Sequence, residues 1–250
     1  MRSWRSFCAL MAYQFRYNFR NRVMFVMNFI MPIGLVALFG FIFGRQTGGY
    51  NLNFFIPGII TLALINASLQ NMSSLTANQI QQGIIKHFFA TPLHPIVWLL
   101  SQVTSLIILN LFQATVAVLT AQWWFGFSLT GGWLSLFLIV ALSGLVLVGC
   151  SLLVAVLTKK VESAQAVGTT LALLFMFLGG LWFPIPSVSP GIDFLINHIP
   201  SSFMTHALRS AAVNGEGLSR ITADLAGLGV FAFVTLLVAG ERFMRMKRPA

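Results

Sequence analysis

The chain alternates long apolar stretches with short polar segments. Six apolar stretches follow one another, over 23–43, 54–77, 97–121, 133–158, 164–183 and 225–240. About 20 apolar residues in a helix cross the ~30 Å hydrocarbon core of a bilayer. The pattern therefore predicts six membrane-spanning helices, of which the last is short.

The segment before the first stretch has a helical pattern instead of a continuous apolar run. At about 100° per residue, Arg2, Arg5, Arg16 and Arg20 cluster on one face. The opposite face carries Trp4, Phe7, Cys8, Met11, Phe15 and Phe19. We expect an amphipathic helix that lies in the membrane interface. Its basic face would serve either as a simple anchor or as a docking surface for a cytosolic partner.

These patterns predict an all-α integral membrane protein with a single transmembrane domain over 1–250. Its expected parts are an interfacial helix (1–22), spans one to five (23–183), an outer region (184–224), span six (225–241) and a basic cytosolic tail (242–250). The outer region is too apolar for a solvated loop, and its prolines interrupt it too often for a seventh crossing. We expect short re-entrant helices there, packed against protein or lining a wet cavity, as a lid or exit gate.

Composition and charge agree with a membrane protein and give it an orientation. The chain is 57% hydrophobic and 8% charged, whereas about 25% of the residues in a soluble domain are charged. Of its 15 lysines and arginines, only Arg45, Arg209 and Arg220 fall on one side of the predicted membrane. Basic residues stay on the cytoplasmic side, so both termini are expected there. The net charge of +10 then attracts anionic headgroups, and nucleic-acid binding is not expected.

Motifs for bond chemistry are missing from the sequence. There is no G-x-x-x-x-G-K-[ST] phosphate loop, no H-E-x-x-H and no G-x-S-x-G. Cys8 and Cys150 lack the spacing of a metal site. We therefore expect no catalytic residues, no metal and no cofactor in this chain.

The spans offer uncharged polar groups in place of the acids and bases that ion-driven carriers usually hold. Span two is the richest, and span three follows. Our candidates for a substrate pathway are Asn66, Gln70, Asn71, Asn110 and Gln113. The alternative role for these side chains is hydrogen bonding between helices.

Two loop motifs connect these features to a known family. Gln82-Gly83 leads to Ala90-Thr91-Pro92-Leu93 after span two, and Gly179-Gly180 leads to Phe183-Pro184 after span five, followed by Pro200 and Ala207-Leu208-Arg209. This order resembles the membrane subunit of type-2 ATP-binding-cassette (ABC) transporters, the permeases of bacterial exporters. One departure is a run of glutamines, Gln79, Gln81 and Gln82, where members often carry charged residues.

The resemblance implies several roles. The cargo would be an amphipathic drug, lipid or glycan, exported across the bacterial inner membrane by a homodimer or heterodimer of permease chains. A separate ATPase would bind ATP and magnesium. Its expected contacts are Arg16, Arg20, Gln82, Gly83, Lys86, Thr91 and Pro92. The expected outer gate is Gly179, Gly180, Trp182, Phe183, Pro184 and Pro200.

Three other functions remain open from the residues alone. A secondary carrier would need a coupling-ion site and an internal repeat. A membrane assembly factor would share the hydropathy but act with a partner other than an ATPase. An intramembrane enzyme is the weakest alternative, because the chain shows no catalytic constellation.

Overall fold

The computed structural model describes residues 2–20, 22–43, 52–85, 95–181, 190–216 and 220–245. Within these ranges every regular element is a helix. In chain order they are α1 (Arg2–Arg20), α2 (Arg22–Phe43), α3 (Leu52–Ile65), the π-helix η1 (Asn66–Met72), α4 (Ser73–Gln81), α6 (Pro95–Phe125), α7 (Gly132–Thr158), α8 (Val161–Leu178), α9 (Pro190–Asn197), α10 (Pro200–Ala212) and α11 (Thr222–Arg245).

Five of the described helical segments are long and apolar enough to cross a membrane. They are Phe54–Gln81, Ile96–Phe125, Gly132–Thr158, Val161–Leu178 and Thr222–Arg245. The first predicted span falls on α2, whose apolar part, Val26–Ile42, is shorter. The structure thus supports five of the six predicted spans by length and composition.

The helices that carry the last two predicted spans do not end where the apolar stretches end. Span five was expected to reach residue 183, but α8 ends at Leu178 because Gly179 caps it and Gly180 adopts a left-handed φ of 61°. The short sixth span, predicted over 225–241, lies within the 24-residue helix α11. Its additional residues include the charged Asp224, Arg242 and Arg245, and an Arg245–Glu241 pair joins the last turn.

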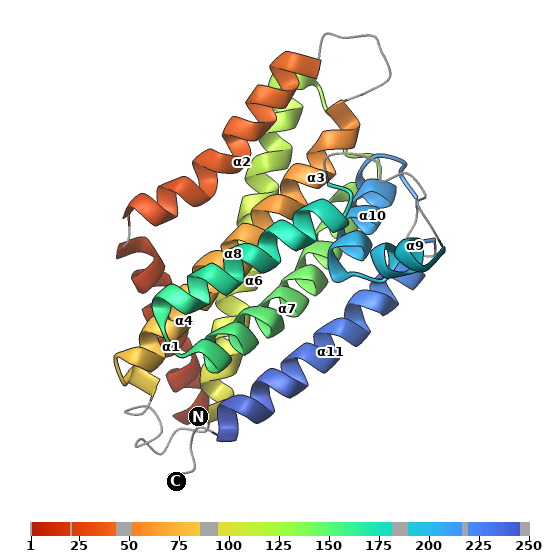
Figure 1. Ribbon diagram of the computed structural model, residues 1–250. Helices are drawn as coiled ribbons and strands as arrows, with labels where there is room; N and C mark the ends of the chain where they lie inside the picture. Colours follow the sequence, from red (N-terminus) through yellow and green to blue (C-terminus); the bar gives the residue numbers. More distant parts are fainter. Residues whose placement is uncertain are drawn as a thin grey trace.

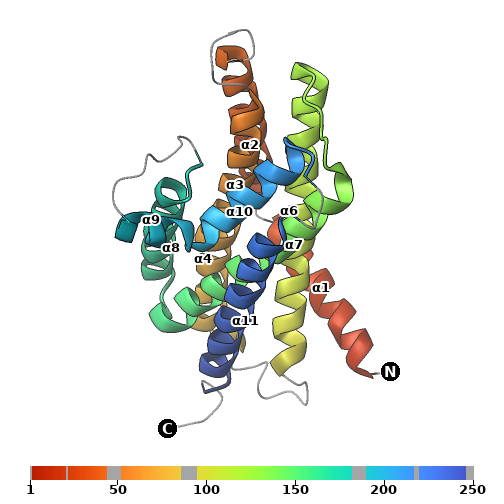
Figure 2. The same cartoon turned by 90° about the vertical axis from the view of Figure 1, so that its right-hand side faces the viewer.

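Helix α7 occupies the middle of the bundle, with contacts to α6, α10, α11, α4 and η1 (Figures 1 and 2). The α3–η1–α4 segment is also central, because 78% of its most apolar part is buried. By contrast, α8 and α11 lie at the periphery, and only 17% of the most apolar part of each helix is buried. Most of the surface of these two helices therefore faces lipid or a partner.

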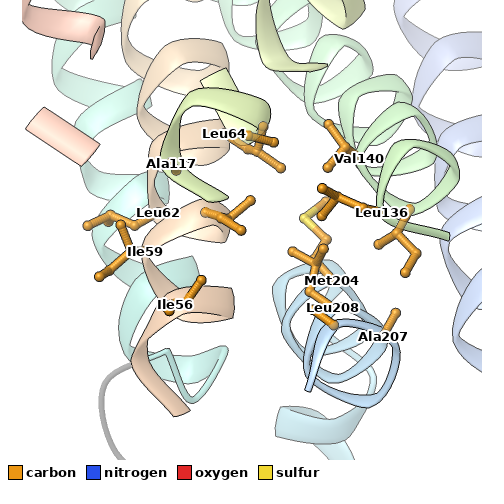
Figure 3. Packing of buried hydrophobic residues seen from close by; sticks show 14 of the residues in the cluster. Ile56, Ile59, Leu62, Leu64, Ala117, Leu136, Val140, Met204, Ala207 and Leu208 are labelled. Atoms are coloured by element: carbon orange, nitrogen blue, oxygen red, sulfur yellow. The ribbon is translucent and has the colours of Figure 1, made fainter. Parts of the chain in front are cut away.

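The main apolar core joins α3, α7 and α10 at one end of the bundle, which we call the α10 end. Figure 3 shows Met204 and Leu208 of α10 between Ile56 and Ile59 of α3 and Leu136 of α7. Met204 and Leu208 are fully buried. In lipid such helices associate mainly through close packing, since the surrounding tails are equally apolar. Helix α10 therefore acts as a packed wedge and not as a solvated loop.

A second cluster marks the opposite end, which we call the termini end. Leu10, Ile85, Trp98, Val156 and Phe243 are buried together there. The rings of Trp98 and Phe243 stack with centroids 4.8 Å apart.

Through this cluster α1 is joined to α6 and α11. The face of α1 that packs on the bundle carries Leu10 and Gln14. Of the apolar face predicted from the sequence, Phe7, Met11 and Phe15 are half-buried and Cys8 is exposed. The helix itself is thus present, but its buried line lies to one side of the predicted apolar face.

Candidate functional site

The most unusual local feature is a π-helical segment inside a continuous helical rod. Helices α3, η1 and α4 follow one another without a break from Leu52 to Gln81, a length of about 45 Å at 1.5 Å per residue. In the π-helix η1 the backbone hydrogen bonds span five residues instead of four, which changes the directions of the polar side chains on this segment. Such segments are rare and frequently occur at functional sites.

One side of η1 faces a groove of about 290 Å³. The groove is lined by Met31, Leu35, Leu62, Asn66, Gln70, Ala172, Leu173 and Met176, from α2, α3, η1 and α8. Gln70 Nε2 donates to Asn66 Oδ1 at 2.9 Å, and Asn66 Nδ2 lies 3.6 Å from Met31 Sδ. The structure thus brings two of the predicted pathway residues together as a polar pair on an otherwise apolar wall.

Helix α8 closes one side of this groove by approaching the backbone of η1. A β-carbon added at Gly168 would overlap the carbonyl oxygen of Leu69. Only glycine allows this approach, as is usual where membrane helices pack closely. The width of the groove is therefore set by direct backbone contact between α8 and η1.

The other three predicted pathway residues lie away from the groove. Asn71 Nδ2 donates to Asn28 Oδ1 at 2.6 Å, and Gln113 Nε2 donates to the Asn28 backbone oxygen at 2.5 Å. Asn110 is fully buried on α6, close to Gly144 of α7, and within the described residues its amide has no hydrogen-bond partner. For Asn71 and Gln113 the contacts favour the alternative role of interhelical hydrogen bonding.

The bond from Gln113 has a simple cause. In a regular helix the Asn28 carbonyl would accept the N–H of residue 32, but residue 32 is a proline inside α2 and has none. An orphan carbonyl is costly inside a membrane. Gln113 of α6 supplies the missing donor, and beside it Asn28, Asn71 and Ser105 line a cavity of about 20 Å³, enough for one water molecule.

At the termini end of the rod, two glutamines tie α4 to its neighbours. Gln102 Nε2 of α6 donates to Gln79 Oε1 at 3.2 Å, and both side chains are buried. The Val161 N–H at the start of α8 donates to Gln81 Oε1 at 3.3 Å. These glutamines stand where family members often carry charges, and here they bond within the chain.

The predicted coupling turn follows directly. Gln82 is exposed at the end of α4, and Gly83 has a φ of 73°, a left-handed conformation that side-chain-bearing residues adopt at a cost. Among the described residues, no atom lies within 4 Å of a β-carbon added there. The glycine is therefore required for the backbone conformation and not for space.

The remaining predicted coupling residues are placed only in part. Arg16 is exposed on α1, and Arg20 lies in the last turn of that helix. Lys86, Thr91 and Pro92 lie outside the described residues.

A family model described as ABC-2 type transporter matches residues 5–213 of the chain. The chain belongs to the ABC-2 type transporter family. A search of curated proteins finds no match. Family membership makes the chain the membrane-spanning permease component of an ABC transporter, which pairs with an ABC ATPase subunit. Together with the apolar helices, it indicates a multi-pass membrane protein.

In this ABC-2 permease the predicted outer gate is described only in part. Gly179 N–H donates to the Phe175 carbonyl at 2.9 Å, and Pro200 is buried as the first residue of α10. A β-carbon at Gly58 of α3 would overlap the Leu181 carbonyl oxygen. The turn after α8 is therefore packed tightly against α3. Trp182, Phe183 and Pro184 lie outside the described residues.

Sequence reasoning missed two elements of this site. One is Asn28, which a proline four residues further along an apolar helix could have signalled. The other is the bond from Gln81 to the start of α8, for which the sequence holds no signal because it joins residues 80 positions apart.

Proposed function

We propose that this permease exports an amphipathic substrate, of the drug, lipid or glycan type, using ATP hydrolysis by a separate ATPase chain. The observation that supports this most is the groove at η1. Its wall is apolar except for the uncharged pair Asn66 and Gln70. Such a surface suits an apolar body with a few hydrogen-bonding groups better than it suits a small ion.

The rod that carries η1 gives a route for mechanical coupling. Its termini end stops at the Gln82–Gly83 turn, where the partner ATPase, with bound ATP and magnesium, would push. Because Gln81 is bonded to Val161, a displacement of the turn moves the start of α8 with it. Both walls of the groove, η1 and α8, then shift together.

The distribution of charge supports an orientation for the permease. Arg16, Lys159, Lys160, Arg242 and Arg245 are exposed on the helices and turns of the termini end. Basic residues are retained in the cytoplasm. We infer that this end, with both termini and the interfacial helix α1, faces the cytoplasm of a bacterium across its inner membrane.

A second permease chain, identical or related, would complete the groove. Along α8, Val167 and Leu173 are exposed, and Leu173 also lines the groove. Pairing of two chains through α8 and η1 would enclose the pathway between them.

The experiment compares two replacements of Gly83 in the permease, copurified with its ATPase in nanodiscs. Gly83→Pro cannot adopt a positive φ, whereas Gly83→Asn tolerates it. We expect the proline variant to lose the stimulation of ATPase activity by substrate, and the asparagine variant to keep most of it. The thermal unfolding midpoints of both variants should stay near that of the wild type.

The result against the proposal would be full stimulation and transport in Gly83→Pro. Failure of the permease to bind any ABC ATPase would remove the coupling mechanism altogether. In inside-out vesicles, where the cytoplasmic face points outward, ATP added outside should drive uptake of the substrate into the lumen. ATP-driven loss of preloaded substrate from these vesicles would contradict the proposed direction.

A further inference from the structure

A second cavity lies at the α10 end and shares no residue with the groove at η1. Its volume is about 170 Å³. Its lining comes from the end of α8 and its turn (Leu178, Gly179, Gly180), from α9 (Ile196, Asn197) and from α10 (Ser202, Thr205, His206, Arg209). The cavity differs from the groove because a permanent positive charge lines it.

That charge, Arg209, has few partners. Its Nη2 donates to the Gly180 carbonyl at 3.4 Å, and its guanidinium lies 3.9 Å from the centre of the Phe54 ring. Its Nε is buried and makes no hydrogen bond. Burial lowers the pKa of Arg209 from its ordinary value. The guanidinium has five N–H donors, and one hydrogen bond from it is found among the described residues.

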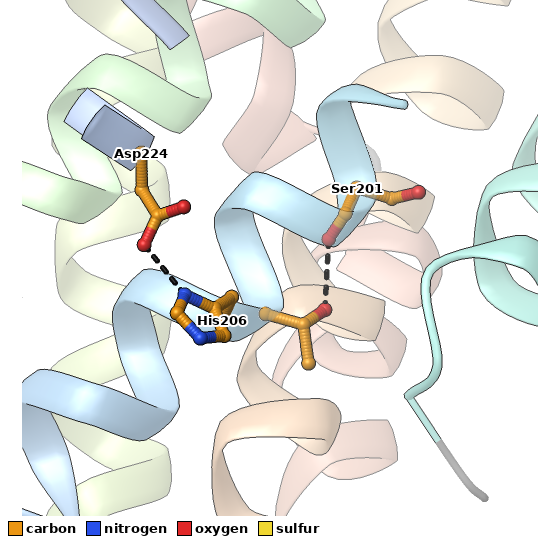
Figure 4. A network of polar contacts seen from close by, with 4 residues as sticks. Ser201, His206 and Asp224 are labelled. Carbon is orange, nitrogen blue, oxygen red and sulfur yellow. Dashed lines mark hydrogen bonds and ion pairs between the residues drawn. The ribbon is translucent and has the colours of Figure 1, made fainter. Parts of the chain in front are cut away.

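The carboxylates of the chain do not neutralise Arg209. All five acids lie in the described ranges, and none of them forms an ion pair with it. The nearest pair on α10 joins His206 Nδ1 to Asp224 Oδ2 at 2.6 Å (Figure 4). Glu216 pairs with Arg220, and Glu241 with Arg245. A half-buried cation without a counter-ion is costly, which favours an anion from outside the chain.

The two hydroxyls that line the cavity do not serve as donors to such an anion. Thr205 donates to the Ser201 carbonyl at 2.8 Å, and Ser202 donates to the Ile196 carbonyl at 2.6 Å. Both hydroxyls are thus already engaged as donors. Arg209 would be the main binding group, with the Asn197 amide at the opposite wall.

Apolar surface leads away from the cavity along α8. Leu174 precedes Leu178 by one helical turn on the same face, and it is 48% exposed. Phe177, beside it, is 66% exposed. A molecule with its anionic group on Arg209 could therefore lay an apolar tail on α8.

We propose that this cavity binds the anionic headgroup, a phosphate or a carboxylate, of an amphiphile whose tail lies along α8. Two sources share this chemistry: a membrane lipid and an anionic cargo molecule. The inference does not depend on export, because binding requires neither ATP nor an ATPase.

The test is native mass spectrometry of the permease in a neutral detergent, titrated with dioleoyl phosphatidylglycerol. We expect the wild type to retain one lipid molecule more tightly than it retains phosphatidylcholine. Arg209→Gln should weaken this binding about tenfold, the value of one charge-assisted hydrogen-bond pair. Arg209→Lys should weaken it less, because it keeps the charge but loses the planar fork. Arg220→Gln, which removes an exposed charge paired with Glu216, should have no effect.

Competition separates the possible ligands. Dodecyl phosphate should displace the lipid, whereas inorganic phosphate at the same concentration should not. Displacement by dodecyl phosphate alone supports an amphiphile site that cargo can also reach. Equal displacement by inorganic phosphate would overturn the amphiphile assignment.

Equal lipid affinity in the wild type and Arg209→Gln would overturn the site itself. If Arg209→Gln does not fold, the wild type decides the question, since equal retention of phosphatidylglycerol and phosphatidylcholine would contradict an anion site.

Discussion

The groove at η1 and the cavity at the α10 end bury different kinds of polar group. In the groove, the uncharged side chains of Gln70 and Asn66 bond to each other at 2.9 Å. In the cavity, Arg209 carries a full charge, and its one hydrogen bond to a described residue is 3.4 Å long. One region satisfies its polar groups from within the chain, and the other leaves donors for something outside it.

Depth in the membrane explains the difference. A charge at the bilayer centre costs about 2.5–3.5 kcal/mol or more, so the middle of a span can hold only amides and hydroxyls. Near the end of the bundle, water and headgroups lower this cost. The polar groups of the groove are therefore paired amides, whereas the polar group of the cavity is an arginine.

The largest expected effect comes from breaking the backbone contact between α8 and η1 that sets the width of the groove. Gly168→Ala puts a β-carbon against the Leu69 carbonyl of η1 and forces α8 outward, which should cost about 2–3 kcal/mol of unfolding free energy. Gly229→Ala is the control, because nothing lies near that position. The measurement is the thermal unfolding midpoint in detergent, and equal midpoints for both variants would show that α8 does not rest on η1.

A smaller effect is expected from removing the hydrogen bond between Gln113 and the Asn28 carbonyl. Gln113→Leu leaves the Asn28 carbonyl without a donor and should cost about 1–1.5 kcal/mol. In Pro32→Ala the helix itself regains an N–H for that carbonyl, so adding Gln113→Leu to it should cost much less. A double-mutant cycle of unfolding free energies measures this coupling. Additive costs would show that the bond contributes nothing.

The smallest effect concerns the charged region. Phe54→Leu removes the ring under the Arg209 guanidinium and should cost about 1 kcal/mol, a value typical of a partly desolvated cation–π contact. Phe177→Leu on the exposed surface of α8 is the matched control. Chemical denaturation in detergent gives both values. If the Phe54 loss persists unchanged in an Arg209→Gln background, which removes the cation, the ring acts through packing alone.

The helices could be predicted from the sequence because their apolar runs are long and separated by glycine, proline and charge. The end of α8 could not, since the apolar Leu181 follows its two glycines and makes the run look continuous. The length of α11 was underestimated because its last turn, with Glu241 and Arg245, is polar yet helical.

The sequence indicated which polar residues belong to the site but not how they are arranged in space. Asn66 and Asn71 are five positions apart, which places them on different faces of a regular α-helix, whereas the wider turns of η1 bring both toward α2. Asn66 lies beside Met31 at the groove, and Asn71 bonds to Asn28. A regular helical projection does not describe this segment. The coupling glycine was identified from its resemblance to a family motif, whereas its positive φ could be known only from the structure.

The bond between Gln113 and the carbonyl left free by Pro32 also predicts how two positions vary in homologous sequences. A homologue without the proline no longer needs the amide of residue 113. A homologue that loses the amide first has a carbonyl without a hydrogen-bond donor until the proline is also replaced. Positions 32 and 113 should therefore vary together across homologous permeases, with proline accompanied by a donor and its absence accompanied by an aliphatic residue.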